Sequence, residues 1–308
     1  MYDLIIIGGG PAGLTAAVYA VRKRLNVLLV SPDLGGKANA RTQIEGIDTY
    51  QVINGADTVR RFRNEIEYLD FARLLESVTA LEKRGADFVV TTDRGRRLEA
   101  RTVILATGAD GVRLNVPGAD RYFLKGLMYS TVSYAPLFVD KQVAVIGSGQ
   151  MALRGAAELA QIARQVFVVA PDHGELDSAI GRRVLASRRV TLYENWTPDA
   201  VEGDNFVHSL VVKSAAGEKK TLDVDGIFVE LGLRPRSNLV QGLAELDDAG
   251  HVVVSCGAQT TVPGLYAAGD VSNEPVEQVL IAIGAGAKAT LNAYDYLLQL
   301  EEAAAAPA

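Results

Sequence analysis

An internal repeat constrains the fold of this chain more than any other feature. Residues 4–13 (LIIIGGGPAG) and 143–152 (VAVIGSGQMA) each join an apolar run to a glycine-rich turn and an alanine-rich segment. In both copies an apolar run and then an aspartate follow, and the aspartate lies 25 positions after the first glycine, from Gly8 to Asp33 and from Gly147 to Asp172. Each copy is therefore predicted to be a buried strand, a turn, a helix and a second buried strand.

The glycines of the repeat have a physical role in such a turn. The first glycine permits the tight turn, the second lets the backbone approach a pyrophosphate, and the third lets the helix pack closely on the strand. The free N–H groups at the start of the helix then face the phosphates. The second copy has Ala152 at the third position, so its signal is weaker. The chain is predicted to be α/β, with two Rossmann-like dinucleotide-binding domains.

Two further segments of small residues follow apolar runs. Ala106-Thr107-Gly108 ends the run that begins at Val103, and Ala268-Gly269-Asp270 comes late in the chain. Small residues at a strand end can lie against a flat ligand, and Asp270 can accept a hydrogen bond from a sugar-alcohol hydroxyl. Asp270 can also cap the helix expected beyond it, and the two roles are compatible.

These motifs, in this order, resemble the low-molecular-weight thioredoxin reductase family from Gly8 to about Leu298. The resemblance implies that the protein binds FAD non-covalently. Four segments would form the site: the first glycine turn, the paired glycines after the second strand, the turn at 106–108 and the late aspartate. For the FAD ribose, Asp33 is the first choice and Ser31 the second. The implied FAD-binding residues are Gly8, Gly10, Pro11, Ala12, Gly13, Asp33, Gly35, Gly36, Ala106, Thr107, Gly108, Gly269, Asp270, Gln278 and Val279.

The resemblance also implies the domain organisation. The FAD-binding domain would comprise residues 1–113 plus 243–308, and an NAD(P)-binding-like domain, residues 114–242, would be inserted in it. This is the pyridine nucleotide-disulfide oxidoreductase arrangement. Gly232-Leu233-Arg234-Pro235 resembles the family's hinge back to the FAD domain. A homodimer is expected, as is usual in the family.

The chain departs from the family where the redox-active cysteines would stand. The family places Cys-x-x-Cys after a tyrosine, before the second glycine turn, whereas this chain reads Tyr129-Ser130-Thr131-Val132-Ser133. Serine cannot cycle through a disulfide, and the one cysteine of the chain, Cys256, lies elsewhere. No catalytic side chain is therefore predicted, and the protein is not expected to reduce thioredoxin with NADPH.

The second departure concerns the nucleotide. Members of the family that use NADPH follow the second strand of the inserted domain with His-Arg-Arg, but this chain has Asp172-His173-Gly174-Glu175. A carboxylate repels a 2′-phosphate and accepts a hydrogen bond from a free 2′-hydroxyl, so NADH is favoured and NADPH is unlikely. Arg182 and Arg183 are typical of a solvated helix face. The candidate NAD site comprises Gly147, Gly149, Gln150, Met151 and Asp172; if Met151 and Ala152 crowd the turn, neither nucleotide binds.

Two smaller features bear on the flavin. Where the family has an asparagine in a turn near FAD, this chain has Glu45-Gly46-Ile47-Asp48, so one contact is expected to be missing or replaced by backbone. Tyr129, Tyr134 and Phe138 lie near the lost cysteines and are candidates either for stacking on the flavin ring or for core packing.

Composition excludes several other classes. A formal net charge of −6 argues against nucleic acid as a partner. No apolar run reaches the ~20 residues needed to span a membrane, and no basic leader precedes the first strand, so a cytoplasmic location is expected. The three histidines, His173, His208 and His251, are scattered, and no metal site is predicted.

The leading functional hypothesis is a FAD-dependent oxidoreductase that moves electrons without a protein disulfide. Its donor would be NADH or a protein such as ferredoxin. A ferredoxin–NADP reductase of the thioredoxin reductase type is the first alternative, although such proteins generally keep the basic residues that bind the 2′-phosphate of NADP. A flavin-binding or sensor protein without turnover is the second alternative. Loss of both the disulfide and the basic phosphate-binding residues is expected of a protein that has lost catalysis and still binds flavin.

Overall fold

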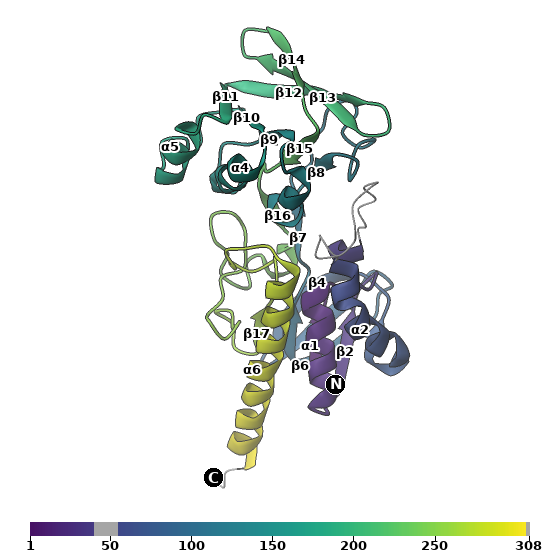
Figure 1. Cartoon of the computed structure of the whole chain (residues 1–308). Helices are drawn as coiled ribbons and strands as arrows, with labels where there is room; N and C mark the ends of the chain where they lie inside the picture. Colours follow the sequence, from purple (N-terminus) through teal and green to yellow (C-terminus); the bar gives the residue numbers. More distant parts are fainter. Residues whose placement is uncertain (40–54, 306–308) are drawn as a thin grey trace. The chain divides into compact units, whose positions relative to one another are not determined.

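The computed structural model describes residues 1–39 and 55–305, and the described chain divides into two compact units (Figure 1). Within that range, unit 1 holds residues 1–39, 55–110 and 234–305, and unit 2 holds residues 111–233. Unit 2 is thus an insertion in the chain of unit 1. The two connecting strands, β7 (Ala109–Gly111) and β16 (Leu233–Pro235), pair with each other.

Unit 1 is built on a seven-stranded sheet in the order β3-β2-β1-β6-β5-β4, with β17 also paired to β6. Its strands are β1 (Tyr2–Ile7), β2 (Val27–Val30), β3 (Arg73–Leu74), β4 (Val78–Arg84), β5 (Asp87–Thr92), β6 (Arg97–Leu105) and β17 (Leu265–Ala267). Its helices are α1 (Pro11–Arg22), α2 (Gly55–Tyr68) and α6 (Val279–Ala305), with short 3-10 turns η1 (Gly36–Asn39), η3 (Asp70–Ala72) and η5 (Asn238–Val240).

The alternation of side chains along β1 gives unit 1 two cores. Leu4 and Ile6 face a cluster supplied largely by α1 and α6, whereas Ile5 and Ile7 face a second cluster that includes residues of β4, β5 and the segment before β17. All four side chains are buried, as expected for a parallel strand covered on both faces. Figure 1 shows α1 and α6 side by side on the same unit.

Unit 2 is built on a fully parallel five-stranded sheet in the order β11-β10-β9-β15-β8, with a separate antiparallel sheet in the order β12-β13-β14. The parallel strands are β8 (Leu127–Met128), β9 (Gln142–Ile146), β10 (Gln165–Ala170), β11 (Val190–Glu194) and β15 (Gly226–Val229). The antiparallel strands are β12 (Trp196–Gly203), β13 (Val207–Ser214) and β14 (Lys219–Asp223). The helical segments are α3 (Thr131–Tyr134), η4 (Ala135–Phe138), α4 (Gln150–Ile162) and α5 (Ala179–Leu185).

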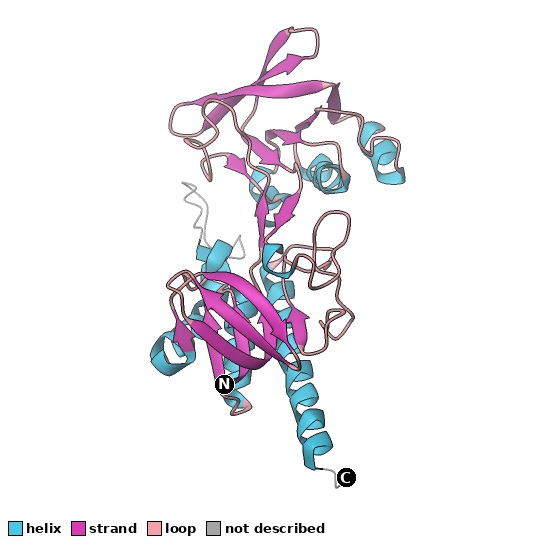
Figure 2. Cartoon of the chain, turned by 180° about the vertical axis from the view of Figure 1, so that it is seen from behind, coloured by secondary structure: helices cyan, strands magenta, loops and turns pink. Residues whose placement is uncertain are grey.

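The parallel sheet of unit 2 is also covered on both faces. Val143 and Val145 of β9 pack with α4 and η4, whereas Ala144 and Ile146 pack with buried residues of β12, β13 and β14. The antiparallel sheet therefore serves as the second cover that a Rossmann-like sheet requires. Figure 2, which views the chain from behind, shows these strands as magenta arrows together with the cyan helices.

The internal repeat of the sequence reappears as the same topology in both units. β1 pairs in parallel with β2, with Leu4 opposite Val27, and β9 pairs in parallel with β10, with Val143 opposite Val166. The next strand inward, β6 in unit 1 and β15 in unit 2, lies on the other side of the first strand. The predicted fold class, two Rossmann-like units with the second inserted in the first, is confirmed.

Candidate flavin and nucleotide sites

The first glycine turn brings two distant parts of the sequence into contact. Gly8 has φ +115°, and a Cβ there would lie 2.2 Å from the carbonyl oxygen of Ala106. A Cβ on Gly13 would lie 1.8 Å from the carbonyl oxygen of Gly8. Only glycine permits these approaches, so the turn at the end of β1, the start of α1 and the end of β6 form one closely packed group.

Gly10 differs from its neighbours because it is open. It is the N-cap of α1, with φ −72° and ψ −174°, and a Cβ there would meet nothing within 4 Å. Pro11 follows at the first helical position, and the first turn carries no acidic side chain. The free N–H groups of this turn and the positive end of the helix dipole fit a pyrophosphate, which could approach the backbone at Gly10.

Other residues of the expected FAD site lie around the same turn. A Cβ on Gly36 would lie 3.2 Å from Cα of Gly10, and a Cβ on Gly269 would lie 3.1 Å from Cβ of Ala12. Gly286 of α6 also packs on Ala12, where a Cβ would lie 2.1 Å from its carbonyl oxygen. Segments from both ends of the sequence are thus held around the first turn of α1 by glycine contacts.

The two candidates for the ribose contact have different surroundings. Ser31 is buried and its Oγ accepts a hydrogen bond of 2.8 Å from the N–H of Gly9, so it stabilises the glycine turn itself. Asp33 is exposed, and its Oδ1 accepts a hydrogen bond of 3.1 Å from the N–H of Gly36. Asp33 retains carboxylate lone pairs that could receive ribose hydroxyls, so it stays the first choice.

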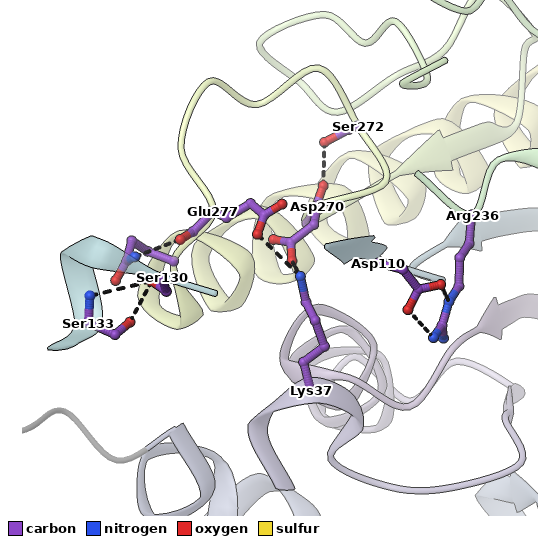
Figure 3. A network of polar contacts seen from close by, with 10 residues as sticks. Lys37, Asp110, Ser130, Ser133, Arg236, Asp270, Ser272 and Glu277 are labelled. Carbon is purple, nitrogen blue, oxygen red and sulfur yellow. Dashed lines mark hydrogen bonds and ion pairs between the residues drawn. The ribbon is translucent and has the colours of Figure 1, made fainter. Parts of the chain in front are cut away.

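The turn at 106–108 is braced by a residue that the sequence did not single out. The N–H of Arg236 donates to the carbonyl oxygen of Gly108 at 2.9 Å, and Oγ1 of Thr107 donates to the carbonyl oxygen of Arg236 at 2.7 Å. The Arg236 guanidinium binds both carboxylate oxygens of Asp110, at 2.6 and 2.8 Å (Figure 3). This bidentate pair raises the pKa of Arg236, so the guanidinium stays charged.

Lys37 is a second residue that the sequence did not single out. Its Nζ lies 2.7 Å from Oδ2 of Asp270 and 3.2 Å from Oε2 of Glu277 (Figure 3). Burial lowers the pKa of Lys37, but the two carboxylates raise it more, so the net pKa lies above the usual value. Gln278 and Val279 follow directly, with Val279 the first residue of α6. An ammonium group is therefore held among residues expected to contact FAD.

The second glycine turn repeats the geometry of the first in unit 2. Gly147 has φ +139°, and a Cβ there would lie 2.5 Å from the carbonyl oxygen of Glu230. Gly149 is the N-cap of α4, and a Cβ there would meet nothing within 4 Å, as at Gly10. Ala152 is fully buried against the sheet, while Met151 beside Gln150 is 38% exposed. The methyl of Ala152 therefore faces the core rather than the open side of the turn.

The acid after β10 is tied to this second turn. Oγ of Ser148 donates a hydrogen bond to Oδ1 of Asp172, and the N–H of Glu175 donates to the carbonyl oxygen of Ser148 at 2.9 Å. His173 lies between Glu194, at 2.8 Å, and Asp177, at 3.1 Å, and these bonds raise its pKa. The end of β10 is rich in carboxylates, and the Asp172 side chain is fixed beside the turn.

The two serines at the family's cysteine positions contact each other. Oγ of Ser130 donates to Oγ of Ser133 at 3.0 Å, and Ser130 caps α3 by accepting from the N–H of Ser133 (Figure 3). The segment between them is a single helical turn. The backbone thus keeps an arrangement in which two side chains at this spacing meet, but both carry hydroxyl groups.

A buried carboxylate lies directly behind this turn. Oε1 of Glu230 accepts hydrogen bonds from the N–H of Thr131 at 2.7 Å and from its Oγ1 at 2.6 Å, and Glu230 is only 7% exposed. Burial raises the pKa of Glu230, against the opposing effect of the two bonds from Thr131, and Glu158 adds to the rise. The carboxyl group of Glu230 therefore holds its proton more tightly in the folded state than in the unfolded chain.

We expect Glu230→Gln to change how unfolding depends on pH. A raised pKa contributes stability that is present below the unfolded value of ~4.3 and is lost as pH rises through the folded value. Glutamine keeps an acceptor for Thr131 but does not titrate. The free energy of unfolding of the variant, relative to wild type, should therefore increase between about pH 4 and neutrality.

Urea unfolding measures this difference. Trp196, the one tryptophan of the chain, lies in β12 and reports on unit 2. Glu158→Gln is the matched control, because Glu158 is less buried and receives no hydrogen bond from Thr131, so its effect should be smaller. A difference for Glu230→Gln that is flat or falls with rising pH would contradict the assignment.

The aromatic residues near the serines have partners within unit 2. Phe138 is buried and packs edge-on against Phe228 at 5.2 Å, so it is not available to stack on a flavin. The hydroxyl of Tyr129 accepts a hydrogen bond from the N–H of Leu114, and Tyr134 packs partly on the same core as Phe138. The turn Glu45-Gly46-Ile47-Asp48 lies outside the described residues.

Comparison with known proteins agrees with this geometry. The family described as "Pyridine nucleotide-disulphide oxidoreductase" matches residues 2–286. The chain belongs to this family. The F component of alkyl hydroperoxide reductase in Staphylococcus aureus is 35% identical over 302 residues, which cover 97% of this chain and 59% of that protein. Its counterpart in Staphylococcus epidermidis has the same identity and coverage, so the chain spans about 59% of the length of these relatives.

Solved structures give the same assignment. Thioredoxin reductase from Streptococcus pyogenes is 30% identical, with a TM-score of 0.87, over 97% of this chain and 99% of that one. Thioredoxin reductase from Giardia duodenalis is 27% identical, with a TM-score of 0.88, over 96% and 99%. The chain therefore has the fold of the thioredoxin reductases, and its family implies a flavin and a nucleotide as cofactors. Among the helices of residues 1–39 and 55–305, none combines the length and the hydropathy of a membrane-spanning segment.

Proposed function

We propose that this protein is a FAD-dependent oxidoreductase that receives electrons from NADH and passes them on without a protein disulfide. FAD would bind to unit 1 and NADH to unit 2. When bound, FAD supplies the two-electron chemistry that a side chain cannot perform. The observation that carries the proposal is the pair Ser130 and Ser133, hydrogen-bonded to each other where the family has its cysteines.

The fit of unit 1 to FAD supports the choice of flavin. Gly8 and Gly13 allow the close contacts that shape the turn, and Gly10 leaves the first turn of α1 open to a pyrophosphate. Asp270 can accept hydrogen bonds from the ribityl chain. Arg236 and Asp110 hold the turn at Thr107 and Gly108 in place. These residues bind and orient the cofactor and take no part in a covalent step.

The surroundings of Asp172 support NADH as the donor. Its carboxylate is fixed by Ser148 beside the second glycine turn, where the ribose of a dinucleotide would lie. Glu175 and Glu194 add negative charge nearby along the chain and at the neighbouring strand end. A 2′-phosphate would meet carboxylates there, whereas a 2′-hydroxyl would find an acceptor. Ferredoxin or another protein donor is the alternative if unit 2 binds no nucleotide.

A homodimer, expected from the resemblance to the family, also belongs to the proposal. Four large apolar side chains of α6 are exposed, namely Leu280, Ile281, Leu291 and Leu298. Such exposure on a single helix is typical of a surface that another chain covers.

Anaerobic reduction of the purified protein tests the function. The protein should carry about one FAD per chain, and NADH should reduce the bound flavin, but NADPH with thioredoxin should not support insulin reduction. A variant with Ser130→Cys and Ser133→Cys is the matched comparison, because it should gain two thiols that oxidise to a disulfide. Released flavin that is FMN, or wild-type turnover with thioredoxin near that of a true reductase, would refute the proposal.

A further inference from the structure

We infer that Lys37 is a cofactor-anchoring residue whose ammonium group binds the pyrophosphate of FAD while holding Asp270. The inference rests on the proposed FAD site of unit 1 and adds a residue to it. Lys37 lies in η1, directly after Gly36, which packs on Gly10 at the first turn of α1. The side chain therefore starts beside the turn expected to receive the pyrophosphate.

Two carboxylates fix the position of the Lys37 ammonium group. Nζ lies 2.7 Å from Oδ2 of Asp270, the residue expected at the ribityl chain, and 3.2 Å from Oε2 of Glu277 (Figure 3). An ammonium group has three N–H donors. Two are directed to these carboxylates, and the side chain is still 48% exposed, so a third can reach a phosphate oxygen.

Charge around the site indicates why a cation is needed. Asp270 and Glu277 place two carboxylates near the position of a cofactor that itself carries two negative charges on its pyrophosphate. Arg236 is engaged by Asp110 in a bidentate pair. Lys37 contacts both carboxylates and is therefore placed to offset this charge. Without the Lys37 ammonium group, the carboxylate of Asp270 would lose its cation, and its repulsion of the phosphates would weaken binding.

Titration of FAD into flavin-free protein tests the inference. Lys37→Gln should raise the FAD dissociation constant about 10- to 100-fold, as for loss of one charged hydrogen bond. Lys37→Arg keeps the charge and should stay within about 5-fold of wild type. Lys23→Gln removes the same charge at the C-terminal end of α1, where Lys23 lies over Tyr294, and should bind FAD as wild type does.

Two further measurements make the result specific. ADP contains the pyrophosphate but no flavin ring or ribityl chain, so its competition against FAD should weaken in Lys37→Gln by a similar factor. Thermal unfolding of the flavin-free variant should stay close to wild type, because ion pairs of a half-exposed side chain contribute little to stability. Unchanged FAD affinity in Lys37→Gln, or a loss confined to FAD and absent with ADP, would overturn the inference. Failure of wild type to bind FAD would instead refute the proposed function.

Discussion

Gly13→Ala should weaken FAD binding by at least ~100-fold. A Cβ at this position would lie 1.8 Å from the carbonyl oxygen of Gly8, so the first turn of α1 must move away from β1. The N–H groups of that turn would then no longer converge on the pyrophosphate. Fluorescence titration of the flavin-free protein with FAD measures the loss, and circular dichroism reports whether the fold is retained.

Gly10→Ala should lower the affinity for FAD without lowering the stability of the flavin-free protein. A Cβ on Gly10 meets nothing within 4 Å, and φ −72° suits alanine, so the flavin-free variant should be as stable as wild type within about 0.5 kcal/mol. FAD affinity should still fall roughly 5- to 150-fold, because the methyl group occupies space that the pyrophosphate needs. Gly284→Ala, on an open position of α6, is the control and should bind FAD normally. Normal FAD binding by Gly10→Ala would show that the pyrophosphate lies elsewhere.

NADH should reduce the flavin in preference to NADPH, with an apparent affinity ~5- to 150-fold higher. Leaving a 2′-phosphate beside the Asp172 carboxylate costs roughly the free energy of a lost charged hydrogen bond, about 1–3 kcal/mol. Asp172→Asn removes the charge and nearly keeps the shape, so the ratio of the two apparent affinities should move toward one. Anaerobic titration of flavin absorbance with each nucleotide gives both values.

The control for Asp172 comes from the same segment. Glu175→Gln removes one charge from an exposed side chain and leaves the hydrogen bond from the Glu175 backbone N–H to Ser148 in place. The Ser148 hydroxyl binds Asp172, so Glu175→Gln should change the ratio less than Asp172→Asn does. Tight reduction of wild type by NADPH with little response to NADH would contradict the role of Asp172. Absence of reduction by both nucleotides would point to a protein donor.

Sequence periodicity and glycine spacing were sufficient to predict the two strand–turn–helix–strand units, whereas the insertion of one domain in the other was implied by the family resemblance. The 25-residue spacing from Gly8 to Asp33 and from Gly147 to Asp172 predicted two equivalent strand–turn–helix–strand units, and β1-α1-β2 and β9-α4-β10 have that form. These patterns are local: a buried parallel strand is apolar at every position, and a turn that approaches phosphate needs glycine. A local pattern of this kind can be read without knowing what packs on it.

Which side chains pack in the cores could be learned only from the tertiary structure. Phe138 was a candidate for flavin stacking in the sequence, but it packs on Phe228 in the core of unit 2. An aromatic residue next to a motif gives the same sequence pattern whether its ring stacks on a ligand or packs in a core. Only the position of β15 beside β9 decides between the two for Phe138.

The charged residues of the two sites divide in the same way. Asp172 was a candidate because of its spacing from Gly147, and Asp270 because it ends the segment Ala268-Gly269-Asp270, so the sequence alone indicated both. No sequence motif marks Lys37, Arg236 or Glu230. Each was recognised only from its contact with a residue far away in the sequence, respectively Asp270, Asp110 and Thr131. Hydrogen bonds and ion pairs of this kind depend on the distance between side chains in space. The sequence determines which groups are able to pair, and the folded chain alone decides which of them meet.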